Sequence, residues 1–379
     1  MKSLIRIVAL GLVAVVGVLA VGCTHGERAL DTESVYMPKY ATGFEVVREK
    51  SSGAHLLLVK NPWQGAEQVR LYAALDATPI PDFEGVRIAT PVQRIVAMSS
   101  SYVAMLDAIG CQERIVGVSG ARFVSTPSVR RAIESKEVCE VGHDANLDFE
   151  LIKSLNTDLV LLYGVSAEEK SVTNKLDELS IPYIYIGDYV ESEPLGKAEW
   201  VMALAWLCGC PEKGEEFFKG VEERYLSIRD KKYCSAYRPQ VMLNLPYRDT
   251  WFMPSTKSYA VCLIEDAGGE YIYPQNDSNS TVPVSLEEAL LLAGKADFWL
   301  NLGQISSLDE LRNAVPRFAK VEAVRSGRVY NNNLRQSVGG GSDFWESGAV
   351  RPDVVLHDLV KILHFEAPTD SLYYYKKLE

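Results

Sequence analysis

The chain has 379 residues, of which 47% are hydrophobic and 23% are charged, and its formal net charge at pH 7 is -11. This length exceeds the usual size of one hydrophobic core, so we expect two domains. The excess of acidic residues argues against nucleic acid as a partner, because phosphate binding requires a basic face.

The N-terminus has the pattern of an export signal. Lys2 and Arg6 precede an apolar stretch at residues 7–21, and small residues then lead to Cys23. The apolar stretch is short for a membrane-spanning helix, which needs about 20 apolar residues. The cysteine after small residues resembles that of a bacterial lipobox. We therefore expect a signal peptide over residues 1–22 and lipidation of Cys23, with a plain signal peptide or an uncleaved anchor as alternatives.

Two segments separate this signal from the main fold. Residues 23–39 are mostly polar, which favours a tether to the lipid anchor. Residues 40–90 contain short apolar and alternating runs between prolines and glycines. This texture predicts a small N-terminal β extension.

From residue 91 the pattern changes to alternating strands and helices, which is typical of a mainly parallel sheet. We expect an N-terminal α/β lobe over residues 91–190. Its predicted strands cover residues 94–98, 114–118, 158–162 and 182–186, and its predicted helices cover residues 102–109, 149–155 and 172–179. The serines at 99–101 are suited to cap the first helix, since their hydroxyls accept from free backbone N–H groups.

Residues 191–230 form one long helical stretch that we expect to connect the lobes, with Gly209, Pro211 and Gly214 as points where it would divide in two. A C-terminal α/β lobe is then expected over residues 231–379. Its predicted strands cover residues 240–244, 251–253 and 297–301, and its predicted helices begin at Pro254-Ser255, at Ser285 and at Pro352. Ser285 and Glu288 have the spacing of a capping box.

The two halves resemble each other. In each, an acidic residue begins a helix that leads to a strand, and a strand ends in a serine-containing turn before another helix. We therefore predict an α/β fold of two similar lobes with mainly parallel sheets, joined by a long rigid interlobe helix and preceded by the small β extension. Ligands of such sheets bind beyond the carboxyl ends of the strands, where helix N-termini favour an anionic group.

Six cysteines follow Cys23, and they match no zinc-binding spacing. An exported compartment permits disulfides, and buried thiols are an equal alternative. Among possible bridges, the sequence favours Cys111 with Cys139.

Residues 94–110, RIVAMSSSYVAMLDAIG, resemble the first strand and helix of the binding proteins of ABC importers for iron complexes and cobalamin. Four later segments fit the same family in the same order, and the resemblance covers about residues 91–365. These segments are residues 150–160, 267–269, 284–290 and 323–329.

The resemblance implies a monomeric solute-binding lipoprotein of the cell envelope, facing the periplasm, that holds its ligand between the lobes and performs no chemistry. It implies ABC permease subunits as partners and an iron complex (ferric siderophore or haem) or cobalamin as ligand. Each lobe of this family offers a glutamate to the permease, and by position these are Glu150 and Glu287. Glu288 is the neighbouring alternative, and solvated helix-start acids are the simpler explanation.

Candidate cleft residues follow from their positions in loops after strands. A ligand that is a flat macrocycle or a catecholate complex requires aromatic walls with few polar groups. Ordinary packing at a lobe edge is the alternative for each aromatic residue. The candidates are Ser100, Ser101, Tyr102, Tyr163, Trp251, Phe252, Met253 and Trp345, with Phe344 beside Trp345 after the glycines 339–341.

The sequence leaves three other functions open. A bare metal site would require several converging ligands, and only His143 lies in a plausible cleft loop; a single haem ligand from Tyr102, Tyr163, His143 or Met253 remains open. No nucleophile elbow, Walker loop or zinc-protease motif occurs in the sequence. The alternatives are a corrinoid- or haem-modifying enzyme in this fold, or a surface capture protein without an importer. We predict no catalytic residues and no cofactor or metal of the protein's own.

Overall fold

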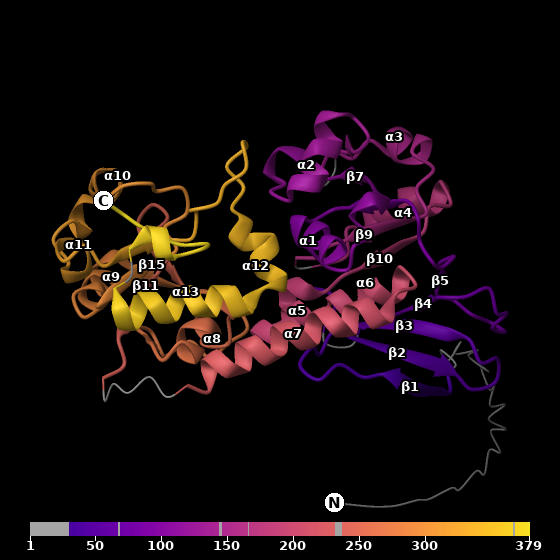
Figure 1. Ribbon diagram of the computed structural model, residues 1–379, viewed down its shortest axis with the longest axis horizontal. Coiled ribbons are helices and arrows are strands. Elements are labelled where there is room, and N and C mark those ends of the chain that lie inside the picture. Colours follow the sequence, from indigo (N-terminus) through magenta and orange to yellow (C-terminus); the bar gives the residue numbers. More distant parts are fainter. Residues whose placement is uncertain (1–29, 67–68, 144–145, 166, 232–236, 367) are drawn as a thin grey trace, which may run out of the picture. The chain divides into compact units, whose positions relative to one another are not determined.

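Figure 1 shows the computed structural model, which describes residues 30–66, 69–143, 146–165, 167–231, 237–366 and 368–379. The predicted signal peptide and Cys23 lie outside these residues. None of the helices in the described part of the chain is both long and apolar enough to cross a membrane.

The first sheet is the predicted β extension, with the strand order β1-β2-β3-β4-β5. Neighbouring strands are antiparallel except β4 and β5. The sheet begins at Thr32, inside the segment expected to be a tether, because the Tyr36 ring stacks on Phe44 with ring centroids 6.1 Å apart. Its strands are β1 (Thr32–Tyr36), β2 (Phe44–Glu49), β3 (His55–Lys60), β4 (Arg70–Ala74) and β5 (Val86–Arg87).

The N-terminal lobe contains a parallel five-stranded sheet with the order β10-β9-β6-β7-β8. Its strands are β6 (Ile95–Ala97), β7 (Ile115–Val118), β8 (Cys139–Glu140), β9 (Leu159–Leu162) and β10 (Tyr183–Tyr185). Its three central strands are buried throughout, as parallel strands under helices are, whereas the edge strand β8 is not. The accompanying helices are α1 (Ser100–Ala108), α2 (Pro127–Glu134), α3 (Phe149–Ser154) and α4 (Lys170–Glu178).

The connection between the lobes consists of three helices, α5 (Pro194–Glu199), α6 (Val201–Leu207) and α7 (Pro211–Arg229). The long helical stretch is thus divided near Gly209 and Pro211, as the sequence allowed, and it has a further break at Trp200. Gly209 has a positive φ of 67°, and Pro211 occupies the first turn of α7, where its missing N–H is harmless. The long element is α7, which packs against α6 and against α13 (Pro352–Phe365).

The C-terminal lobe contains a second sheet with the order β13-β11-β15-β16-β17, parallel except for β17. A separate antiparallel pair, β12 and β14, lies beside α9. The strands are β11 (Gln240–Leu243), β12 (Thr250–Met253), β13 (Glu270–Tyr271), β14 (Val282–Ser285), β15 (Phe298–Leu300), β16 (Val329–Asn331) and β17 (Lys376–Lys377). The remaining helices are α8 (Tyr259–Asp266), α9 (Leu286–Ala293), α10 (Leu308–Ala314), α11 (Glu322–Arg325) and α12 (Ser347–Val350).

Two predicted helix starts have different outcomes. Ser285 caps α9 as expected, since its Oγ accepts from the Glu288 N–H at 3.2 Å. The helix expected at Pro254-Ser255 begins instead at Tyr259. Ser255 is buried, and its hydroxyl donates to the carbonyl of Ser278 at 2.5 Å, which holds an irregular loop ahead of the helix.

The two mainly parallel sheets, the long helix and the N-terminal sheet confirm the predicted fold class. One hydrophobic cluster runs from the β extension through α1 and α6 into the C-terminal lobe. A second cluster, which includes Val160 and Leu176, lies between the sheet of the N-terminal lobe and α4. The lobes are thus packed against each other through their inner helices, and α1 contacts α12.

Candidate functional site

Each lobe has a topological switch point, where later strands are added on both sides of the first strand of its sheet. In the N-terminal lobe β6 lies between β7 and β9, and in the C-terminal lobe β11 lies between β13 and β15. Ligands of open α/β sheets bind beyond the carboxyl ends of strands at such points. The candidate site is therefore formed by the loops that follow these strands.

In the N-terminal lobe Ser99 and Ser100, at the start of α1, follow β6, and Tyr163 follows β9. The Ser99 Oγ lies 3.0 Å from the Ser101 Oγ and accepts from the Ser101 N–H at 3.4 Å, so the predicted serine cap on α1 forms. Ser100 and Tyr163 are half-buried, and Tyr163 lines a cavity of about 170 Å³. Two of the predicted ligand-binding residues thus lie at the switch point.

In the C-terminal lobe the corresponding loops supply Tyr247 and Arg248 after β11 and Gln304 after β15. All three are exposed, and the Arg248 guanidinium lies 5.2 Å from the centre of the Tyr247 ring. This cation and aromatic ring are suited to a ligand with both a flat and an anionic part.

A loop of residues 332–342, here called the bridging loop, connects these two regions. From this loop, Gly339 N–H donates to the Arg122 carbonyl at 3.0 Å, and Ser337 Oγ donates to the same oxygen at 2.8 Å. On its other side, Gln336 Nε2 donates to Gln304 Oε1 at 3.3 Å. Since Arg122 follows β7 and Gln304 follows β15, the loop brings the carboxyl ends of both sheets together.

Two glycines of the bridging loop, Gly339 and Gly341, explain how closely it approaches the N-terminal lobe. A Cβ on Gly339 would lie 2.5 Å from the Arg122 carbonyl oxygen, and one on Gly341 would lie 2.4 Å from the Phe123 carbonyl oxygen. Both contacts are far shorter than a real side chain allows. The glycines at 339 and 341 therefore permit a backbone-to-backbone contact between the lobes.

A buried carboxylate makes a second connection between the lobes. Glu346, which precedes α12, accepts from the Ser125 N–H at 2.7 Å and from the Thr126 N–H and hydroxyl, both at 2.6 Å. These donors stand at the N-terminus of α2, so the carboxylate caps a helix of the other lobe. Burial raises the pKa of Glu346 to about 7 despite these hydrogen bonds.

Several predicted ligand-binding residues have no surface for a ligand in this structure. Tyr102, Trp251 and Met253 are each 0% exposed, and Ser101 is also buried. The Tyr102 hydroxyl donates to the carbonyls of Leu162 and Ile186, at 3.2 and 3.0 Å. Trp251 Nε1 likewise donates to a backbone carbonyl, so these side chains are packed and satisfied within their lobes.

The alternation of strand β12 explains one of these placements. Trp251 and Met253 point into the core, where Trp251 packs on Trp299 and Phe318, and Phe252 between them is 43% exposed. Trp345 follows the bridging loop and is 54% exposed, while its neighbour Phe344 is buried. Phe252 and Trp345 are thus the predicted aromatic residues that offer the most surface in the C-terminal lobe.

Sequence reasoning missed the pair Arg122 and Phe123 as well as Tyr247 and Arg248. The Arg122 guanidinium lies 4.4 Å from the centre of the Phe123 ring, and both side chains are exposed. The signal was present in the sequence, since each pair follows a predicted strand. Each pair places an exposed cation on an aromatic ring in a loop that follows a strand of its lobe.

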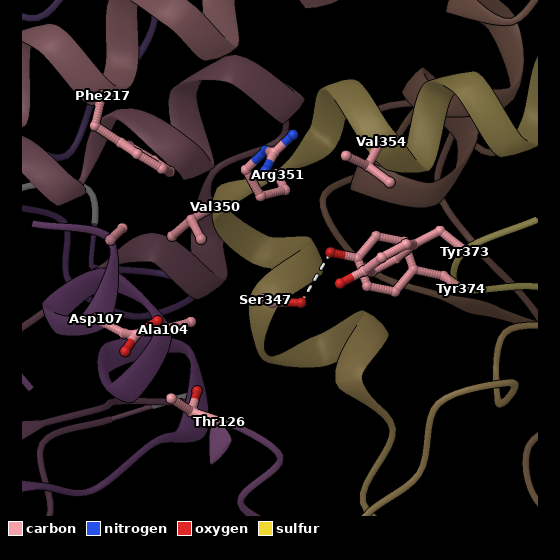
Figure 2. Close-up of a pocket in the computed structure, with 11 residues that line it drawn as sticks. Ala104, Asp107, Thr126, Phe217, Ser347, Val350, Arg351, Val354, Tyr373 and Tyr374 are labelled. Atoms are coloured by element: carbon pink, nitrogen blue, oxygen red, sulfur yellow. Dashed lines mark hydrogen bonds between the residues drawn. The ribbon is translucent and has the colours of Figure 1, made fainter. Parts of the chain in front are cut away.

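A larger pocket, of about 290 Å³, lies between the lobes on the α7 side (Figure 2). Ala104 and Asp107 of α1 face Ser347 and Val350 of α12 across it. The pocket adjoins the C-terminal half of α1, whereas the switch point lies at its N-terminus. It is therefore distinct from the candidate site.

The two predicted docking residues are exposed on equivalent helices. Glu150 lies in the first turn of α3, which leads to β9, and Glu287 lies in the first turn of α9, which leads to β15. Glu287 lies 3.1 Å from the Arg317 guanidinium, but both side chains are more than half exposed. Such an exposed pair is weak and leaves the carboxylate available to another cation.

Among the described residues no group of three or more His, Cys, Asp or Glu side chains is arranged to hold a metal ion. His143 is exposed in its loop. The structure brings Cys111 together with Cys208 and Cys210, whereas Cys139, its expected partner, lies on the edge strand β8.

Known proteins similar to this chain agree with the predicted family resemblance. The family model described as periplasmic binding protein matches residues 95–332. An uncharacterised lipoprotein of Methanocaldococcus jannaschii is 24% identical over 357 residues, which cover 87% of this chain and 82% of that protein. A second uncharacterised lipoprotein of that organism is 24% identical over 77% of this chain and 76% of its own length.

Two solved structures show the same fold. The apo form of the periplasmic haem-binding protein RhuT from Roseiflexus sp. RS-1 has a TM-score of 0.57 at 21% identity, covering 72% of this chain and 98% of that chain. The periplasmic vitamin B12 binding protein BtuF of Vibrio cholerae has a TM-score of 0.52 at 17% identity, covering 72% and 97%.

Proposed function

Since the chain belongs to the periplasmic binding protein family, we propose that it is a lipid-anchored solute-binding protein that delivers an iron complex or a corrinoid to an ABC importer. The family comprises solute-binding proteins without enzymatic activity, and membership implies a small-molecule ligand and a permease partner. One observation carries the proposal. The loops at the switch points of the two lobes are connected by hydrogen bonds from the bridging loop.

The proposed ligand class rests on the exposed side chains in and near these loops. Tyr163, Tyr247, Phe252 and Trp345 supply partly or fully exposed aromatic surface. Arg122 and Arg248 add cations, and the capped start of α1 adds N–H groups that favour an anion. A flat chelate with anionic substituents, such as haem or a ferric catecholate, or a corrinoid with its phosphate, fits this combination.

Delivery would use the exposed acids of the two lobes. Glu150 and Glu287 stand at the starts of equivalent helices, so one arginine-bearing permease half can meet each lobe. Individual exposed ion pairs contribute little, and two simultaneous contacts with long-range steering would supply the specificity.

Anchoring would place the protein outside the cytoplasm. Cys23 follows a signal-like segment, and two relatives from Methanocaldococcus jannaschii are described as lipoproteins. Acylation at Cys23 would hold the protein beside its membrane-embedded permease through buried methylenes.

Intrinsic fluorescence tests the binding role, because the proposed site includes the exposed Trp345. The full chain, purified in detergent, is titrated with haem, cobalamin and a ferric catecholate siderophore. We expect saturable quenching by one of them. Tyr163→Ala and Trp345→Ala should each lower the affinity for that ligand by about ten-fold, since one buried aromatic contact contributes roughly 1–2 kcal/mol.

The matched control is Phe365→Ala, which removes an aromatic ring that is 69% exposed at the end of α13. It should leave the affinity unchanged. Equal weakening in all three variants, or quenching that never saturates, would oppose the proposed site.

A further inference from the structure

Three cysteines meet where α1 ends and α6 gives way to α7. Cys111 follows Gly110 at the end of α1, Cys208 ends α6, and Cys210 precedes α7. The Sγ atoms of Cys111 and Cys210 are 3.8 Å apart. The Cys208 thiol is near enough to the Cys111 sulfur to lower the pKa of Cys111. The three thiols thus form one cluster, although Cys111 and Cys210 are 99 positions apart in the chain.

The contact between the Cys111 and Cys210 sulfurs is suited to the formation of a disulfide bond. Disulfide formation requires the two Cα atoms to stand within a narrow range and the side chains to point toward each other, and facing sulfurs in contact satisfy the second condition. In the described part of the chain this cluster is not arranged as a metal site. Its remaining chemistry is thiol–disulfide exchange.

We propose that Cys111 and Cys210 form a reversible disulfide, by exchange with an external disulfide, that fastens the end of α1 to the start of α7. Cys208 stays reduced beside them. The cluster is a redox-sensitive modification site of the N-terminal lobe, separate from the ligand site at the opposite end of α1.

The surroundings suit Cys111 as the attacking thiolate. The neighbouring Cys208 thiol, helped by the charge of Arg114, lowers the pKa of Cys111 to about 6. The Arg114 guanidinium is held beside the cluster, since it donates to the carbonyls of Val92 and Cys208 at 2.8 and 2.9 Å. Burial and the neighbouring Cys111 charge raise the pKa of Cys210 to about 11.

Exposure assigns the order of the two steps. Cys210 is half-buried, whereas Cys111 is only 1% exposed. An external disulfide RSSR first exchanges with Cys210, which loses its proton, forms a Cys210–SR bond and releases one RSH. The Cys111 thiolate then attacks the Cys210 sulfur and displaces RS⁻, which takes up a proton. In sum, two protein thiols are oxidised to one disulfide, and RSSR is reduced to two RSH.

The bond would stabilise the N-terminal lobe. It closes a loop of about a hundred residues that contains four of the five strands of the lobe's sheet, β7 to β10, and long loops gain most from closure. We expect the oxidised protein to unfold at a Tm higher by at least about 5 °C than the reduced protein.

Oxidised glutathione is the probe for the test. The full chain is reduced, desalted and incubated with it, and free thiols are alkylated under denaturing conditions and counted by intact mass. We expect two thiols to disappear without a glutathione adduct. In Cys111→Ala, glutathione should remain attached to Cys210, because the attacking thiolate is missing.

The other cysteines provide the controls. Cys208→Ala should still form the disulfide, but more slowly, and Cys262→Ala, which removes a half-buried thiol of α8, should behave as the wild type. The fold of each variant is checked by its Tm in reductant. Unchanged loss of two thiols in Cys111→Ala or Cys210→Ala, or no loss in the wild type, would overturn the proposal.

Discussion

Glu346 and Thr126 join the two lobes through a pair of 2.6 Å hydrogen bonds, one from the Thr126 N–H and one from its hydroxyl. The carboxylate belongs to the segment that precedes α12, and the donors belong to the start of α2. With the bridging loop, this contact fixes how the carboxyl-end loops of one lobe meet those of the other.

The contact between Glu346 and Thr126 should make stability depend on pH. Burial, aided by the charge of Asp343, raises the pKa of Glu346 to about 7, so the folded protein binds a proton that the unfolded chain releases above about 4.5. The contribution is fully present below pH 4.5 and is lost as pH rises through 7, a change of up to about 3 kcal/mol.

Glu346→Gln should remove this part of the pH dependence, because the amide does not titrate. The free energy of unfolding, measured with denaturant between pH 4.5 and 8, should fall less steeply in the variant than in the wild type. Glu137→Gln, at an exposed position of the N-terminal lobe, is the control and should keep the wild-type slope. Identical slopes in all three proteins would refute the assignment.

Ligand binding should cause only a modest adjustment between the lobes. Hydrogen bonds from the bridging loop and from Glu346 already connect them, and three packed helices form the connection. Small-angle scattering with and without ligand should give nearly equal radii of gyration. A large compaction on binding would contradict this expectation.

Reversing both proposed docking acids should uncouple binding from uptake. Glu150→Arg combined with Glu287→Arg places two cations where the permease would offer cations, so uptake in cells should be lost while ligand affinity stays the same. Glu322→Arg, an exposed acid of α11, is the control for added charge. Normal uptake in the double variant would favour a capture protein without an importer.

The β extension should be held to the lobe by Glu199. This carboxylate is 1% exposed and accepts from the Tyr36 hydroxyl and from the N–H groups of Lys39, Tyr40 and Ala41. Glu199→Ala would leave these donors without their acceptor, at a cost of at least about 3 kcal/mol. Denaturant unfolding measures this loss, and limited proteolysis should cut near residue 40.

Glu193→Ala provides the comparison, because Glu193 is an exposed residue immediately before α5 in the same connection. Its removal should change the free energy of unfolding by less than about 0.5 kcal/mol. Equal stability of the two variants would show that the extension is held by its apolar contacts instead.

Local pattern was sufficient to predict most of the fold, because the periodicity of the sequence reports which faces are buried. The buried strand at β9 and the serine cap on α1 are local features, and both formed as expected. The break at Gly209 and Pro211 was visible as a possibility, but it depends on how closely Gly209 approaches Pro91. Such contacts between distant segments leave no periodic signal.

The site was harder to predict for the same reason. Tyr102 was expected to face a ligand from its position after a strand, but its hydroxyl is satisfied by the carbonyls of Leu162 and Ile186, which lie at the ends of β9 and β10. The burial of Glu346 likewise depends on Thr126, 220 positions away. A single sequence predicts which residues lie in loops, whereas tertiary packing determines the direction in which each side chain points.

The most direct test of the central claim is the visible absorption spectrum of the purified full chain after incubation with haem, cobalamin or a ferric catecholate siderophore and removal of free ligand by desalting. The account predicts that one of the three remains bound at close to one molecule per chain. Retention of none of them would contradict the proposal that this protein carries an iron complex or a corrinoid.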